Sequence, residues 1–127
     1  MTCWTRTLAA AALLTAASWA QALTTAPYTA QALASAQQAG QPVAVHFHAD
    51  WCPTCKQQEK ALALLKTEPG LDITVLVADY DLEKDLRKAM KVRMQSTMVV
   101  FKGSEEKARL AGDTAPDKIR ATLKAGL

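Results

Sequence analysis

Apolar and polar positions alternate in short blocks after the first part of the chain. Residues 28–41 are rich in alanine and glutamine, which favour helix, and Gly40 predicts where this helix ends. Residues 43–48 form a short apolar and aromatic run that is typical of a buried strand. His46 and His48 occupy alternate positions of this run, so we expect both on one face of the strand.

The next blocks continue the alternation of helix and strand. Residues 53–65 combine strong helix formers with an apolar stripe, and Pro69 and Gly70 follow them, which predicts a second helix. Residues 73–78 are apolar and predict a second buried strand. Residues 82–91 place apolar side chains on one side of a helical pattern, which predicts a third helix.

The C-terminal blocks predict a hairpin and a final helix. Residues 98–101 and 107–111 read as two strands joined by a glycine-containing turn. Asp113 or Thr114 is expected to cap the last helix, with Pro116 in its first turn. The pattern therefore predicts an α/β domain with four strands and helices between them.

The beginning of the chain differs from the rest. Arg6 is followed by an apolar run of the length found in secretory signal peptides. Small residues at Ser18, Ala20 and Ala22 match the cleavage pattern, so we expect residues 1–22 to be a signal peptide cut after Ala20 or Ala22. The alternative is a buried N-terminal helix. The apolar stretch falls short of the ~20 residues that a membrane span needs.

Length and charge limit the number of domains and the kinds of partner that the chain can have. The chain has 127 residues, half of them hydrophobic, which is enough for one small domain at residues 23–127. The net charge of +3 is small, and basic residues alternate with acidic ones from Lys56 to Lys124, so no basic face typical of nucleic-acid binding stands out. We expect a monomer without a cofactor and without a nucleic-acid partner.

The cysteines carry the clearest chemistry. Removal of the signal peptide takes Cys3 with it and leaves Cys52 and Cys55, two residues apart, where a strand gives way to a helix. A helix N-terminus favours the thiolate form, so Cys52 can attack a substrate disulfide, and Cys55, one turn later, can release the product. Pro53 suits the first turn of that helix because it has no N–H group to satisfy.

Two other interpretations of the cysteines remain open. Export to an oxidising compartment also permits a structural disulfide, although a bridge closing so short a loop removes little chain entropy. Alternatively, His46 and His48 together with Cys52 and Cys55 offer two imidazoles and two thiolates, a ligand set suited to Zn²⁺ or a copper ion. Their spacing does not match the usual zinc-finger arrangement.

Residues 46–56 resemble the active-site segment of the thioredoxin superfamily. Residues 99–103 resemble the strand and turn after the family's substrate loop, and residues 110–112 resemble the stretch before its last helix. This resemblance covers most of the mature chain. It implies the thioredoxin fold, a central mixed sheet of about four strands flanked by helices on both faces, and thiol:disulfide exchange by Cys52 and Cys55.

Two narrower resemblances bear on direction and partners. Residues 49–52 and Lys56 are similar to the C-terminal domain of DsbD-type electron-transfer proteins, which implies an exported reductase of protein disulfides that a membrane or soluble redox partner recycles. Residues 52–55 also occur in reductases of cytochrome c maturation, and a disulfide-forming oxidase is a further alternative. Three neighbours of the cysteines are expected to support the site: Trp51, Pro53 and Thr54.

The first departure from the family pattern lies in the substrate loop. Gln95, Ser96 and Thr97 correspond to that loop, and Ser96 stands where the family has a cis-proline. A cis bond before a residue other than proline costs about 2.5–4 kcal/mol, so we expect a trans bond and a changed substrate groove. Loss of the proline ring would also give a metal ion room beside the cysteine pair.

The second departure lies on the strand before the cysteines. His46 takes the place of a buried acid that serves the family as proton acceptor for the second cysteine, and Val77 replaces the lysine that often pairs with that acid. Histidine titrates near neutrality and can accept a proton from Cys55. The alternative is a core histidine hydrogen-bonded to backbone.

Overall fold

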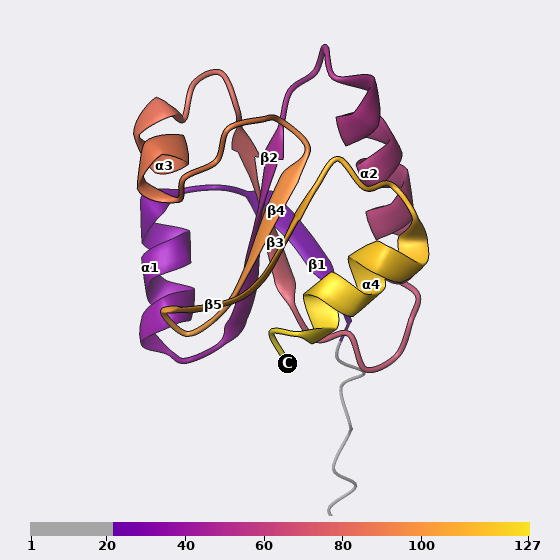
Figure 1. Cartoon of the computed structure of the whole chain (residues 1–127). Coiled ribbons are helices and arrows are strands. Elements are labelled where there is room, and N and C mark those ends of the chain that lie inside the picture. The colour runs from indigo at the N-terminus through magenta and orange to yellow at the C-terminus, as the bar shows by residue number, and fades with distance from the viewer. Residues whose placement is uncertain (1–21) are drawn as a thin grey trace, which may run out of the picture.

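A computed structural model describes residues 22–127 of the chain (Figure 1). Apart from Ala22, the predicted signal peptide lies outside the described residues, as does Cys3. No helix within residues 22–127 is long and apolar enough to cross a membrane. In chain order the elements are β1 (Thr24–Pro27), α1 (Ala30–Gln38), β2 (Pro42–His48), α2 (Pro53–Leu65), β3 (Thr74–Asp79), α3 (Lys84–Ala89), β4 (Thr97–Lys102), β5 (Glu105–Ala111) and α4 (Pro116–Lys124).

The strands form one mixed sheet in the order β1-β3-β2-β4-β5. β3 pairs in parallel with β1 and β2, whereas β4 runs antiparallel to both β2 and β5. All four predicted strands are present, including the β4-β5 hairpin. β1 was missed, because its four residues show no apolar alternation and end at Pro27. The sheet therefore has five strands rather than about four.

Helices cover both faces of the sheet, as the resemblance implies. Figure 1 shows α1 and α3 on one face and α2 and α4 on the other. Alternate residues of β2 belong to two separate hydrophobic cores. Val43, Val45 and Phe47 pack on the α1/α3 side, and Ala44 packs on the α2/α4 side. His46 shares the parity of Ala44 and is fully buried, so its ring enters the layer under α2.

The start of α4 differs from the prediction. Ala115 occupies the N-cap position and makes no side-chain hydrogen bond, so neither Asp113 nor Thr114 caps the helix. Asp113 is engaged elsewhere: its carbonyl accepts a hydrogen bond from Gln58, and its carboxylate lies 3.4 Å from Lys118. Pro116 does begin the helix, as expected, because an N-terminal position needs no N–H donor.

Candidate functional site

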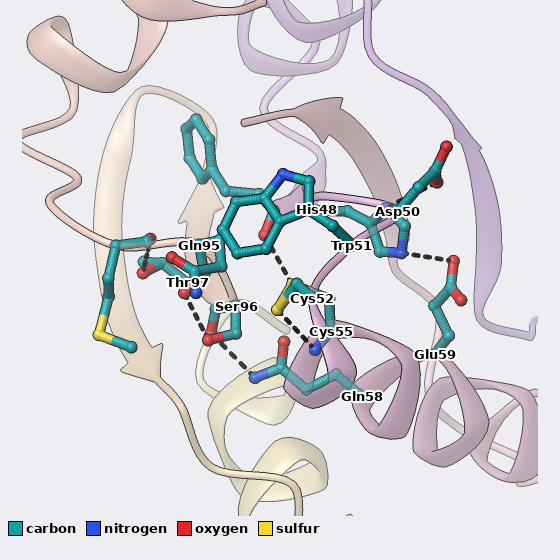
Figure 2. Close-up of a disulfide and its surroundings, with 12 residues drawn as sticks. His48, Asp50, Trp51, Cys52, Cys55, Gln58, Glu59, Gln95, Ser96 and Thr97 are labelled. Atoms are coloured by element: carbon teal, nitrogen blue, oxygen red, sulfur yellow. Dashed lines mark hydrogen bonds and ion pairs between the residues drawn. A yellow bond between two sulfur atoms is a disulfide. The ribbon is translucent and has the colours of Figure 1, made fainter. Parts of the chain in front are cut away.

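Cys52 and Cys55 lie at the junction between β2 and α2 and are joined by a disulfide, with their Cα atoms 5.3 Å apart (Figure 2). Both residues are buried in this oxidised form, Cys52 with 1% of its surface exposed. The Sγ atom of Cys52 accepts a hydrogen bond from the Cys55 amide at 3.1 Å, and the Sγ atom of Cys55 lies 3.9 Å from the Phe47 carbonyl. One backbone group therefore lies close to each sulfur atom, an amide at Cys52 and a carbonyl at Cys55.

The local sequence explains this placement. Cys52 is the N-cap of α2 and has extended backbone angles, and Pro53 follows at the first helical position. α2 runs for 13 residues, so the free amides and the dipole at its N-terminus act on the Cys52 sulfur. A negative charge on that sulfur is stabilised there, which is what a nucleophilic thiolate needs.

Trp51 lies on the surface beside the disulfide and has 58% of its surface exposed. Its indole N–H donates a hydrogen bond to Oδ2 of Asp81, which follows β3, at 2.7 Å. Figure 2 shows the indole ring next to the cysteines. Of the two residues between the cysteines, Pro53 is exposed and Thr54 is half-buried. The ring of Trp51 thus provides an apolar surface at the edge of the site.

Ser96 follows a trans peptide bond, as expected, and no cis bond occurs anywhere in residues 22–127. Its φ of 63° lies in the left-handed region, which residues with a Cβ atom seldom adopt. Two backbone hydrogen bonds hold it: its N–H donates to Phe47 at 2.9 Å, and its carbonyl accepts from Gly112 at 3.0 Å. The loop is therefore fastened to β2 on one side and to the end of β5 on the other.

The side chains of the predicted substrate loop are mostly hidden. Ser96 and Thr97 are buried, and the Thr97 hydroxyl donates to the Met94 carbonyl at 2.8 Å. The Ser96 hydroxyl bonds to the Gln95 carbonyl. Gln95 is half-buried and Met94 is exposed. A substrate at this loop therefore meets the backbone and the side chains of Met94 and Gln95, rather than those of Ser96 and Thr97.

His46 is hydrogen-bonded to a side chain, not to backbone. Its Nε2 atom lies 2.8 Å from Oε1 of Gln58, and both residues have no exposed surface. Burial lowers the pKa of His46 from 6.5 to about 4, the bond to Gln58 opposes this, and the nearby His48 adds to it. The imidazole is therefore neutral at neutral pH. A cavity of about 170 Å³ adjoins it, with Glu59 and Lys66 among its lining residues.

The proposed metal ligands do not come together. Within residues 22–127 there is no group of three or more His, Cys, Asp or Glu side chains placed to hold a metal ion. Nε2 of His46 is taken by Gln58, and Nε2 of His48 lies 3.2 Å from Glu59 (Figure 2). The two imidazole rings stack edge to face with centroids 5.8 Å apart. The structure therefore does not bring the four expected ligands together, because each histidine faces its own partner on α2.

Gln58 is the site residue that the sequence analysis missed. It lies on the buried side of α2, where its neighbours at helical spacing are Cys55, Ala61, Leu62 and Leu65. A polar side chain within that apolar stripe was the available indication, because a buried amide needs hydrogen-bond partners. Its partners lie far away in sequence, so the pattern alone does not reveal them.

The fold and the disulfide at the head of α2 define a thioredoxin-like oxidoreductase with a Cys52–Cys55 pair. The thioredoxin family model matches residues 21–125 of this chain. The chain therefore belongs to the thioredoxin family.

Individual relatives agree with this assignment. A thioredoxin of Mycolicibacterium smegmatis is 32% identical over 76 residues, which is 58% of this chain and 68% of that protein. The chloroplastic thioredoxin X of Arabidopsis thaliana is 33% identical over 69 residues, 54% of this chain and only 38% of that protein's length. Among solved structures, Trxlp from Edwardsiella tarda is 33% identical with a TM-score of 0.72, covering 80% of this chain and 97% of its own.

Proposed function

We propose that this protein is an exported thiol:disulfide oxidoreductase that reduces disulfides in other proteins. The observation that carries the proposal is the position of the Cys52 sulfur, at the N-cap of α2 and 3.1 Å from the Cys55 amide. That position favours a thiolate at Cys52 and keeps the second sulfur within bonding distance. A merely structural bridge across so short a loop adds little stability.

The reaction has two exchange steps. In the reduced protein the Cys52 thiolate attacks one sulfur of a substrate disulfide, which forms a mixed disulfide and releases one substrate thiolate. Cys55 then gives up its proton and attacks the Cys52 sulfur, which closes the Cys52–Cys55 bond and releases the second substrate thiolate. Two electrons pass from the dithiol to the substrate, and a separate thiol partner must return them.

Export and the reductase direction are parts of the proposal. Export is supported by the Arg6 and apolar pattern of residues 1–22, and direction by the similarity of residues 49–52 and Lys56 to DsbD-type domains. Expression of the whole chain in a bacterium tests export. We expect the protein in the periplasm with a new N-terminus after Ala20 or Ala22, and an intact chain in the cytoplasm would contradict it.

Reduction of insulin disulfides by dithiothreitol tests the activity. The reduced protein should accelerate it, Cys52→Ser should not, and Thr67→Ser is the matched control, because Thr67 is exposed beyond the end of α2. Full activity in Cys52→Ser would end the proposal. The direction is tested by equilibrium with glutathione: a potential near the thioredoxin value of about −270 mV supports a reductase, and one near the DsbA value of about −120 mV supports an oxidase.

A further inference from the structure

Gln58 is a buried amide that joins three separate segments of the fold. Its Nε2 atom donates hydrogen bonds to the carbonyl oxygens of Ser96 and Asp113, both at 2.9 Å. Its Oε1 atom lies 2.8 Å from Nε2 of His46. One side chain on α2 therefore links β2, the loop before β4 and the loop before α4; Figure 2 shows it reaching toward Ser96.

The partners of Gln58 fix its orientation. Carbonyl oxygens only accept, so the amide nitrogen must face Ser96 and Asp113, and the amide oxygen is left to face His46. That oxygen also only accepts, so Nε2 of the neutral imidazole must carry the proton. Nδ1 of His46 is then the basic nitrogen, and it has no hydrogen-bond partner among the residues that the structure describes.

The same amide holds the substrate loop. Ser96 has a left-handed φ of 63°, which costs a residue with a Cβ atom free energy and persists only where surrounding contacts enforce it. Two backbone hydrogen bonds restrain Ser96, from its N–H to Phe47 and from Gly112 to its carbonyl. Gln58 adds a side-chain hydrogen bond to the same carbonyl.

We propose that Gln58 is a positioning residue of the exchange reaction, which holds His46 in the Nε2-protonated tautomer and holds the substrate loop through Ser96. This inference rests on the proposed function. The single amide of Gln58 therefore positions both the candidate proton acceptor, His46, and the backbone of the substrate loop at Ser96, beside the dithiol. Loss of Gln58 therefore disturbs both, although the hydrogen bonds of Gln58 go to His46, Ser96 and Asp113 and not to either sulfur.

Two variants separate the effect of Gln58 on the His46 tautomer from its effect on the substrate loop. Gln58→Met has a similar length and removes all three hydrogen bonds. Gln58→Glu keeps an acceptor for His46 but cannot donate to two carbonyl oxygens. Gln57→Met is the matched control, because Gln57 is the exposed neighbour on the same helix. Circular dichroism confirms folding, and ¹⁵N spectra of labelled histidine report the tautomer.

At pH 7.5 we expect Nε2-protonated His46 in the unaltered protein, Gln58→Glu and Gln57→Met, and mixed tautomers in Gln58→Met. In insulin reduction, KM should rise about tenfold in both Gln58 variants, in line with one or two lost hydrogen bonds, while kcat falls in Gln58→Met.

An Nδ1-protonated His46 in the unaltered protein overturns the inference even if neither variant folds. A Gln58→Met protein with an unchanged tautomer and the KM of Gln57→Met also overturns it. An unaltered protein inactive on insulin would refute the proposed function, and the spectra would still decide the tautomer.

Discussion

Nε2 of His46 lies 2.8 Å from Oε1 of Gln58, and neither side chain reaches the surface. This pair occupies the place where the family pattern has a buried acid. A buried acid resists losing its proton, whereas a buried imidazole resists gaining one, because burial penalises the charged form in both cases. Burial therefore keeps His46 neutral near pH 7, and its pKa of about 4 makes it a weaker proton acceptor than the histidine of ordinary pKa that the sequence analysis expected.

The stability of the protein should fall in mild acid. The pKa of His46 is lowered from 6.5 to about 4 in the folded protein. Between these values the unfolded chain binds a proton at this position and the folded protein does not, so the free energy of unfolding decreases as the pH falls. The full effect is about 3 kcal/mol, spread over this window. Urea denaturation at pH 7.5 and pH 4.5 measures it.

His46→Asn is the control for this effect, since carboxylates elsewhere in the chain also contribute to acid sensitivity. The variant lacks the titrating ring, so its free energy of unfolding should change less between the two pH values than that of the unaltered protein. Equal changes in both proteins would show that His46 is not the group responsible.

Substitutions at Ser96 should reveal the cost of its backbone conformation. Ser96→Gly and Ser96→Ala both remove the hydroxyl and differ only in the Cβ atom, which is disfavoured at a φ of 63°. We expect the glycine variant to be more stable than the alanine variant by about 1 kcal/mol. Thermal denaturation measures the difference, and a more stable alanine variant would be inconsistent with a left-handed residue here.

The hydrogen bond between Trp51 and Asp81 should position the indole for substrate. Asp81→Ala removes the acceptor, and because the bond is exposed, the loss of stability should not exceed about 1 kcal/mol. We expect a raised KM for insulin, an unchanged kcat and a shift in Trp51 emission. Asp72→Ala, an exposed residue before β3, is the control. Unchanged KM and emission in Asp81→Ala would remove Asp81 from this role.

Much of the fold follows from local patterns in the sequence. The apolar run of β2 and the helix formers of α2 placed the strand-to-helix junction correctly, and with it Cys52 and Cys55. β1 was not predicted, because its four residues have no pattern of their own and are set by pairing with β3. The capping prediction for α4 failed because the helix begins one residue later than expected, with Ala115 as N-cap, and the Asp113 carboxylate pairs with the Lys118 side chain instead of a free amide.

The candidate site was only partly predictable, because several of its contacts join residues that are distant in sequence. The dithiol depends on neighbours in sequence, whereas the contacts of His46 with Gln58 and of Gln58 with Ser96 join residues 12 and 38 positions apart. The sequence offered two histidines and two cysteines as an alternative metal-ligand set, but α2 gives each histidine a separate partner. Pairings of that kind depend on how the helix packs on the sheet.

Trapping of the mixed disulfide tests the central claim most directly. Cys55→Ser leaves Cys52 able to attack a substrate but removes the thiol that resolves the intermediate. After incubation of the reduced variant with insulin, mass spectrometry should find an insulin chain bound to Cys52 in a large share of the molecules, and the unaltered protein should show little adduct. Absence of an adduct on Cys52 in the variant would contradict the assignment of Cys52 as the attacking thiol.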